Sequence, residues 1–447
     1  MSSETGSKPA LIRAIRGRGI ALIVINSMVG AGIFALPGSV GAVAGSLSPW
    51  LFVAIGVLFI TIVLSFAELA SYFRDSGGPV LYAQTAFGPL AGFSSGWLLY
   101  ISRLAAFAAN TNAMAAYLGA MWPWVGSGVG RVTFMSVVCV GLVAANYVGV
   151  RDGIRTLAVF TFLKITPIVI LVLLGLKEVT GDTLLPDSMP TIDDFGGLTL
   201  LIIYAFIGFE VATVVSGETK NPTKTLPRAL VATVAGTSVL YCLIMLVFVA
   251  VIPEGSREGS SLSDVARELA GPIGAVVIAL TAVFSIGGNL ASNMLSMPRL
   301  SFALGEQGML PAWFARIHPR FSTPGNSVIV FGAVALLLAL PGTFATLAAA
   351  ASLARICSYM LSIAGLPLIR RRAEPEVAAA AYRLPFGLLI PAIALMLCVW
   401  IALDAPGITW LIMGGLLAAG LVMYGLTQVF ARGNGATAQT GPSEPLS

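Results

Sequence analysis

The stretch Asn26-Ser-Met-Val-Gly-Ala-Gly-Ile-Phe-Ala-Leu-Pro-Gly38 decides the fold, because it places three glycines and a proline inside a long apolar run. Lipid offers no hydrogen bonds to the backbone groups that a broken helix releases, so such a break must be buried or must face a water-filled cavity. A Gly-x-Gly pair also lets a ligand approach the backbone closely. Close helix packing through small residues is the alternative interpretation of Gly30-Ala31-Gly32.

The composition is that of a membrane protein. Of the 447 residues, 57% are hydrophobic and 10% are charged, against about 25% charged in ordinary soluble domains. The apolar content excludes a disordered chain. The net charge of +5 does not indicate nucleic-acid binding, since the basic residues fall in short loops between apolar runs. The sequence therefore predicts an all-α integral membrane protein with many spans.

Apolar runs near the spanning length of about 20 residues predict twelve transmembrane helices, so both termini lie on the same side. Most of the 25 Lys and Arg residues fall in the N-terminal segment and the even-numbered connections, whereas Arg131, Lys177, Arg257 and Arg267 fall on the other side. The positive-inside rule then places both termini in the cytoplasm. The predicted spans are 18–45, 50–73, 88–122, 132–149, 155–176, 196–217, 229–252, 271–298, 326–340, 343–369, 385–403 and 408–430.

The sixth predicted span repeats the interruption of the first, because Tyr204-Ala-Phe-Ile-Gly-Phe-Glu-Val-Ala-Thr213 places Gly208 and Glu210 at membrane depth. Interrupted segments in matching positions of two inverted halves indicate the midplane site of a secondary transporter. We therefore expect a five-plus-five inverted-repeat fold with discontinuous helices 1 and 6. Its expected parts are a cytoplasmic tail over 1–17, a first repeat over 18–176, an inverted repeat over 196–369, two more helices over 385–430 and a disordered cytoplasmic tail over 431–447.

The two breaks offer a site for a zwitterion. The N-terminus of a helix binds a carboxylate through unpaired N–H groups and the positive end of its dipole, and here those groups belong to Ala31, Gly32 and Ile33. The carbonyls at the C-terminus of a half-helix accept hydrogen bonds from an ammonium group. The other predicted substrate-binding residues are Met28, Val29, Gly30, Tyr204, Ala205, Ile207 and Gly208. Amino acids are the expected substrates.

Three motifs lie in the right order along residues 18–430 to indicate a family. Val29-Gly-Ala-Gly-Ile-Phe34, Phe206-Ile-Gly-Phe-Glu210 and Leu304-Gly-Glu-Gln-Gly-Met-Leu-Pro311 resemble segments of the amino acid–polyamine–organocation transporters. The resemblance implies amino acid transport by alternating access, here in a bacterial inner membrane. It also implies that Tyr204 covers the bound substrate from outside, and it matches Glu210 to a pH-sensing acid of the arginine/agmatine antiporters.

Lys164 lies well inside the fifth predicted span, where a charged residue is a functional candidate. Burial disfavours the charged form of an amine, so Lys164 could gain and lose a proton. The resemblance implies that its ammonium group replaces the sodium ion of sodium-coupled relatives, bridging carbonyls near the first break to Ser285, Asn289 or Ser292. A permanently charged strut and a side chain that snorkels toward the cytoplasm are the alternatives.

Arg103 lies inside the third predicted span. It could clamp a substrate carboxylate through two hydrogen bonds, but an internal ion pair with Glu68 or Glu210 is the favoured interpretation. For Glu68 itself we expect a packing or gating role, and for Arg355 a structural role.

Proton-coupled uptake of neutral amino acids is the function that these features favour. Exchange without ion coupling, and transport of cationic amino acids or polyamines, are alternatives of the same class; a channel and a non-transporting sensor are alternatives of other classes. The chain is not expected to be an enzyme, since no catalytic pair with recognisable spacing lies at membrane depth. No cofactor or metal is expected, since the single histidine, His318, lies in a polar loop and the four cysteines lie in apolar runs.

Overall fold

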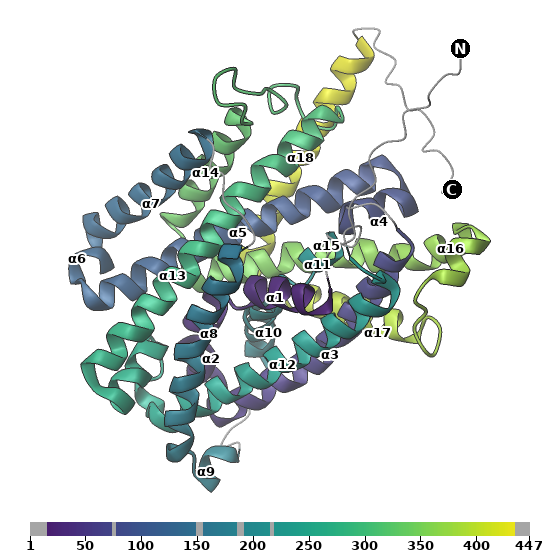
Figure 1. Cartoon of the computed structure of the whole chain (residues 1–447). Coiled ribbons are helices and arrows are strands. Elements are labelled where there is room, and N and C mark those ends of the chain that lie inside the picture. The colour runs from purple at the N-terminus through teal and green to yellow at the C-terminus, as the bar shows by residue number, and fades with distance from the viewer. Residues whose placement is uncertain (1–15, 74–76, 149–154, 186–191, 215–218, 434–447) are drawn as a thin grey trace.

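Helices make up the regular structure of the described part of the chain (Figure 1), which covers residues 16–73, 77–148, 155–185, 192–214 and 219–433 of this computed structural model and contains no β-strand. The α-helices are α1 Gly17–Met28, α2 Ala31–Ala44, α3 Ser48–Ser71, α4 Gly78–Phe87, α5 Pro89–Met121, α6 Pro123–Gly126, α7 Gly128–Val148, α8 Arg155–Gly175, α9 Gly181–Leu184, α10 Ile192–Phe206, α11 Val211–Val214, α12 Pro222–Val251, α13 Leu262–Glu306, α14 Gly325–Ala339, α15 Phe344–Arg372, α16 Pro375–Ala380, α17 Leu389–Leu403 and α18 Gly407–Gly433. The described residues also form the short 3-10 helices η1 Gly45–Leu47, η2 Leu176–Glu178 and η4 Glu254–Ser256.

Helices occupy all the ranges that the apolar runs predict. The first predicted range holds α1 and α2, the sixth holds α10 and α11, and each of the others holds one long helix. Six helical stretches of the described residues are long and apolar enough to cross a membrane by length and composition: Ala31–Ser71, Gly128–Val148, Pro222–Val251, Leu262–Glu306, Phe344–Arg372 and Gly407–Phe430. The all-helical membrane class is therefore confirmed.

Several helix boundaries differ from the prediction, because hydropathy finds apolar residues and not caps. Helix α13 begins at Leu262 instead of residue 271, since the Ser261 hydroxyl accepts a hydrogen bond from the Ser263 N–H and the Asp264 carboxylate accepts one from the Ser261 N–H. This reciprocal cap satisfies free N–H groups of the first turn. Gly271, with a φ of 69°, kinks the helix where the predicted span begins.

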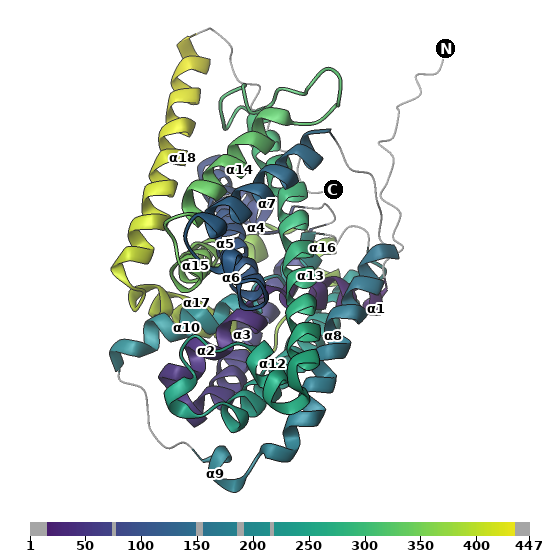
Figure 2. The ribbon, with the colours of Figure 1, turned by 90° about the vertical axis from the view of Figure 1, so that its left-hand side faces the viewer.

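Helices α5 and α15 form the centre of the molecule and pack extensively against each other, and α12 packs in the same way along α3. Most of the apolar stretch of α15 is buried, whereas little of that of α7 and α18 is buried. Figure 2 shows α18 along one edge of the molecule and α1 and α8 along the opposite edge.

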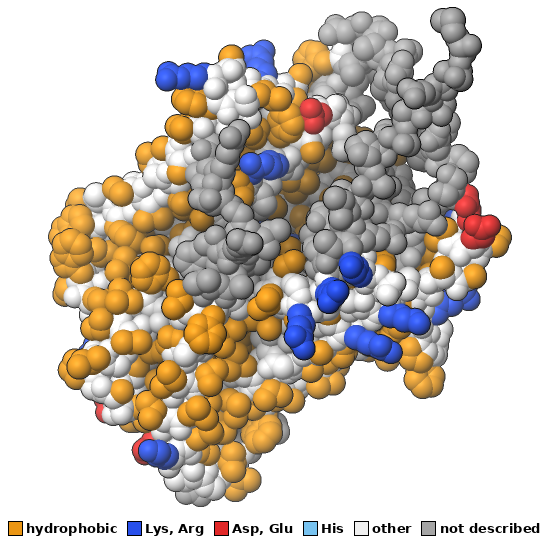
Figure 3. Space-filling view, viewed as in Figure 1, with side chains coloured by type: hydrophobic (Ala, Val, Ile, Leu, Met, Phe, Trp, Pro, Cys, Tyr) orange, Lys and Arg blue, Asp and Glu red, His pale blue; other side chains and the backbone are white. Residues whose placement is uncertain are grey.

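The outer surface is strongly apolar. Figure 3 shows hydrophobic side chains over much of one face, with few charged side chains among them. Large side chains such as Phe162, Phe284 and Leu411 are about two-thirds exposed or more. An apolar surface of this extent fits contact with lipid and not with water.

Candidate functional site

The first break separates α1 from α2. The last helical hydrogen bond of α1 runs from the Val29 N–H to the Ile25 carbonyl at 2.8 Å. The Gly30 N–H donates to the Met28 carbonyl at 2.8 Å, which is not a helical hydrogen bond. Helix α2 then begins at Ala31. The first N–H groups of a new helix have no partner within it, so the predicted groups of residues 31–33 are the free N-terminal donors of α2. All three residues are buried.

The second break separates α10 from α11 and covers residues 207–210. Gly208 has a φ of 125°, which residues with a side chain rarely adopt. In a continuous helix the Gly208 N–H would donate a hydrogen bond to the Tyr204 carbonyl. Here it donates to Glu210 Oε2 at 3.0 Å instead. The Glu210 carboxylate therefore releases the Tyr204 carbonyl from the helix.

The two breaks lie against each other. A Cβ atom built on Gly208 would lie 2.6 Å from Ser27 Oγ, and one built on Gly32 would lie 3.1 Å from the Ala205 Cα. The Tyr241 hydroxyl of α12 lies 3.1 Å from the Met28 carbonyl and 3.2 Å from the Ala205 carbonyl, and so joins the ends of α1 and α10. The sequence analysis missed Tyr241, since an isolated tyrosine in an apolar run carries no motif.

Lys164 of α8 holds the end of α1. Its ammonium group donates to the Asn26 carbonyl at 2.8 Å and to the Val29 carbonyl at 2.7 Å, and its side chain is 5% exposed. The Ser285 hydroxyl of α13 donates to the same Val29 carbonyl at 3.3 Å. Lys164 and Ser285 therefore converge on the first break, as the sequence predicts.

Asn289 and Ser292 of α13 were also predicted near the first break, and only Asn289 lies there. Asn289 Nδ2 lies 3.2 Å from a Cβ atom built on Gly30. Ser292 is exposed, and its backbone carbonyl accepts a bond from Ser296. The buried edge of α13 continues four residues beyond Asn289 through Asn293, and so the structure does not bring Ser292 to the site.

A chain of hydrogen bonds runs from Tyr204 to Arg103. Tyr204 Oη donates to Asn110 Oδ1 at 2.6 Å, and Asn110 Nδ2 donates to Asn289 Oδ1 at 2.8 Å. Asn293 Nδ2 donates to the same oxygen at 2.9 Å, and Arg103 Nη1 lies 3.4 Å from Asn293 Oδ1. The side chain that is predicted to cover the substrate is thus linked to the charged cluster across α5, α10 and α13.

Glu210 is the centre of that cluster. Its Oε1 accepts from Arg355 Nη1 at 2.6 Å and from Arg103 Nη2 at 3.1 Å, and its Oε2 accepts from Tyr359 Oη at 2.8 Å. The internal ion pair expected for Arg103 is therefore present, with Glu210 as its partner. Two guanidinium groups face one carboxylate, and Arg355 Nη2 is buried without a hydrogen-bond partner among the described residues. Sequence reasoning gave Arg355 no partner.

Glu68, the other predicted partner of Arg103, is bound elsewhere. Its two oxygens accept bonds from Arg370 at 2.7 and 2.8 Å, and Oε2 also accepts from the Leu384 N–H at 3.1 Å. The fully buried carboxylate therefore fastens α3 to the end of α15. This agrees with a packing role.

Tyr204 contacts both the first break and Phe344, a residue that lines a cavity. Its Cδ1 lies 3.4 Å from a Cβ atom built on Gly32, and its ring packs edge-on against Phe344 with the centroids 5.8 Å apart. Phe344 lines a cavity of about 450 Å³ together with Tyr117, Arg131 and Asp264. The Tyr204 ring thus joins the first break to one wall of this cavity.

The sequence profile of the amino acid permease family matches residues 18–426. This chain belongs to the amino acid permease family. Both broken helices of the permease and the helices that carry its polar cluster lie within the matched residues. The resemblance to the amino acid–polyamine–organocation transporters is thereby confirmed.

Three relatives are similar along most of their length. The permease is 28% identical over 446 residues to the methylthioribose transporter of Bacillus subtilis, with 95% of each chain covered. It is 25% identical to the branched-chain amino acid permease BcaP of the same bacterium, with 94% of each chain covered. It is 28% identical to the serine/threonine exchanger SteT of that bacterium, over 83% of this chain and 86% of the relative. These relatives are permeases and transporters, not enzymes.

The described residues hold no group of three His, Cys, Asp or Glu side chains that could bind a metal ion. The polar groups around the breaks of the permease are an ammonium, two guanidinium groups, one carboxylate, amides, hydroxyls and backbone groups.

Proposed function

We propose that this permease carries amino acids across the membrane by alternating access around the two breaks. Its proposed architecture is twelve spans in a five-plus-five inverted repeat over 18–176 and 196–369, with two more helices over 385–430. Discontinuous helices 1 and 6 correspond to α1 with α2 and to α10 with α11. The bacterial inner membrane, with both termini cytoplasmic, is the proposed location. The contact between the two breaks is the observation that carries this proposal.

The proposed substrate site binds the two ends of an amino acid at different helices. The N–H groups at the start of α2 take the carboxylate. The Val29 carbonyl is occupied by Lys164 and Ser285, so the ammonium group falls to the end of α10. There the Tyr204 carbonyl is free of the Gly208 N–H. Both predicted breaks then take part in the site, and Glu210 has a positioning role because it binds the Gly208 N–H and leaves the Tyr204 carbonyl free.

Neutral amino acids are the proposed substrate class. Arg103 and Arg355 leave an excess positive charge beside Glu210, and Coulomb repulsion at low dielectric disfavours a substrate with an additional positive charge. The names of two relatives, a branched-chain permease and a serine/threonine exchanger, support neutral substrates. The relative named for methylthioribose makes that sugar a necessary member of any substrate panel.

Proton-coupled symport through Lys164 is the proposed mode. The buried amine contacts two carbonyls of the first break, so a change in its protonation would alter the hydrogen bonds that hold α1. Exchange without ion coupling is the second candidate. The same two bonds suit a permanently charged strut, and one relative is named an exchanger.

Uptake into proteoliposomes tests the proposal. The panel is radiolabelled leucine, serine, arginine, glutamate and methylthioribose, each with and without an inward proton gradient. We expect saturable uptake of leucine or serine that the gradient stimulates. Uptake that requires internal amino acid and ignores the gradient would establish the exchanger. Uptake of arginine, or of methylthioribose alone, would contradict the neutral amino acid assignment.

A further inference from the structure

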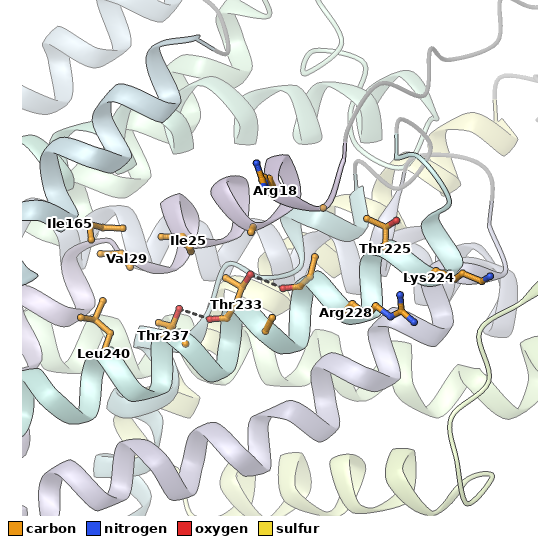
Figure 4. Close-up of a pocket in the computed structure, with 15 residues that line it drawn as sticks. Arg18, Ile25, Val29, Ile165, Lys224, Thr225, Arg228, Thr233, Thr237 and Leu240 are labelled. Carbon is orange, nitrogen blue, oxygen red and sulfur yellow. Dashed lines mark hydrogen bonds between the residues drawn. The ribbon is translucent and has the colours of Figure 1, made fainter.

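A groove of about 740 Å³ lies between α1, α8 and α12, outside the polar chain that joins Tyr204 to Arg103. Figure 4 shows Lys224 and Arg228 toward one end of it, Val29, Ile165 and Leu240 toward the other, and Arg18 between them with its side chain pointing away from α12. Its lining therefore changes from charged to apolar along its length. The transport mechanism proposed above does not use this groove.

Among the described residues, the charged end of the groove carries positive charge alone. Arg18, Lys224 and Arg228 are exposed, and no Asp or Glu lines the groove in the described part of the chain. None of the three forms an ion pair with another described residue. Lys224 and Arg228, four residues apart near the start of α12, suit a phosphate group, which can accept several charge-assisted hydrogen bonds.

The other end offers almost nothing polar to a ligand. Thr233 and Thr237 face the groove, but their hydroxyls donate to the carbonyls of Ala229 and Thr233 at 2.6 and 2.8 Å (Figure 4). Gly236 leaves open space beside them, since no atom lies within 4 Å of a Cβ atom built there. The ligand that fills this end must be apolar.

The length and surroundings of the groove fit a lipid chain. From Arg18 to Val29, helix α1 rises about 16 Å at 1.5 Å per residue, which is close to half of the roughly 30 Å hydrocarbon core of a bilayer. Neighbouring side chains are strongly exposed, at 70% for Phe162, 58% for Leu163 and 57% for Val239. An apolar groove among lipid-facing side chains opens to the bilayer.

We propose that this groove binds one anionic phospholipid of a single leaflet. Its phosphate contacts Lys224 and Arg228, and one acyl chain lies along α1 and α12 as far as Val29. Basic pockets between transmembrane helices bind anionic headgroups in this way. Since the Val29 carbonyl also accepts the Lys164 bond, the bound chain would end beside the first break.

Native mass spectrometry of the full chain in detergent tests the proposal. The ligands are dioleoylphosphatidylglycerol, dioleoylphosphatidylcholine and glycerol 1-phosphate. We expect one phosphatidylglycerol to bind at least about tenfold more tightly than phosphatidylcholine. At about 1 kcal/mol per basic residue, the double variant Lys224→Gln/Arg228→Gln should bind phosphatidylglycerol about 30-fold more weakly, and it should lose less affinity for phosphatidylcholine, whose choline group offsets the charge of its phosphate. Arg316→Gln/Arg371→Gln, which removes two exposed charges outside the groove, should change neither.

A second pair of variants tests the apolar end. Gly236→Leu places a side chain in the open space of the groove and should weaken binding of both lipids at least about tenfold, because it occupies the path of the chain. Gly141→Leu, at an exposed helical glycine with equally open surroundings, is the matched control and should bind both lipids like the wild type.

Four results would overturn the proposal. The first is that the wild type binds the two phospholipids equally, and the second is that Gly236→Leu binds phosphatidylglycerol as the wild type does. The third is that glycerol 1-phosphate displaces the lipid at the same concentration. The fourth is that the wild type has the mass of a dimer and Gly236→Leu has the mass of a monomer. The third result would indicate a soluble anion as the ligand, and the fourth a second copy of this chain.

Discussion

The hydrogen bonds of Lys164 fit two of the three roles that the sequence left open for it, the strut and the coupling group. A buried ammonium group that bonds two backbone carbonyls stabilises the end of α1 whether or not it exchanges protons. Geometry alone does not separate a strut from a coupling group, because both need the same two hydrogen bonds. The separation lies in how transport responds to a proton gradient.

For Lys164→Ala we expect the proton gradient no longer to drive amino acid accumulation, so that only exchange of internal for external amino acid remains. The pH dependence of uptake should also be lost, because the ionisable group at the first break is gone. Uptake in proteoliposomes between pH 5.5 and 8.5 measures this. Lys177→Ala, at an exposed lysine in η2, is the control and should keep both properties. Unchanged pH dependence in Lys164→Ala would remove the coupling role.

In the Glu210 cluster, we expect substitutions of Glu210 and of Arg103 to lower the stability of the protein by different amounts. Arg103→Ala leaves Glu210 paired with Arg355, whereas Glu210→Gln leaves two buried guanidinium groups without a counter-charge. Removing one partner of a buried ion pair costs about 3–5 kcal/mol. We therefore expect Glu210→Gln to lower the melting temperature in detergent clearly more than Arg103→Ala does.

A double variant checks the physical reason. Removing one guanidinium group as well, in Arg355→Ala/Glu210→Gln, should recover part of the lost stability, because it removes one of the two unpaired charges. A double variant that melts below Glu210→Gln would show that packing, and not charge, sets the stability of this cluster.

At the scale of elements, the break between α10 and α11 depends on a glycine. Gly208→Ala forces a side chain into a φ of 125°, at about 1–3 kcal/mol of strain, and places its Cβ against Ser27 of α1. We expect the variant to lose transport and to melt at a lower temperature than the wild type.

Gly197→Ala in α10 is the matched control for that prediction. A Cβ atom there meets only Pro406 at an ordinary 3.8 Å, and alanine favours a helix over glycine by about 1 kcal/mol. Uptake and thermal melting should therefore be at least as good as in the wild type. If both alanine variants transported normally, the contact between the two breaks would not be needed for function.

At the scale of the whole molecule, the basic residues predict which loops face the cytoplasm. In a cysteine-free background, Ser256→Cys in η4 should react with a membrane-impermeant maleimide on intact cells, and Ser322→Cys between α13 and α14 should react only after lysis. Both serines are exposed in the structure. The reverse labelling pattern would invert the proposed orientation.

Local sequence patterns predicted much of the fold and part of the site. The apolar runs and the glycines at 30 and 208 determine where helices form and where they break, because these depend on hydropathy and on backbone freedom within a few residues. Lys164 and Ser285 were predicted to lie near the first break, and both donate hydrogen bonds to the Val29 carbonyl there.

The partners within the site were decided only by the tertiary structure. Tyr241 joins the two breaks, Asn293 accepts a hydrogen bond from Arg103, and Arg355 pairs with Glu210. Each of these contacts brings together residues from different helices, and a single sequence records neither the rotation of each helix nor its neighbour. The sequence by itself determined a helical membrane protein with two interrupted helices, and packing decided which side chains surround the interruptions.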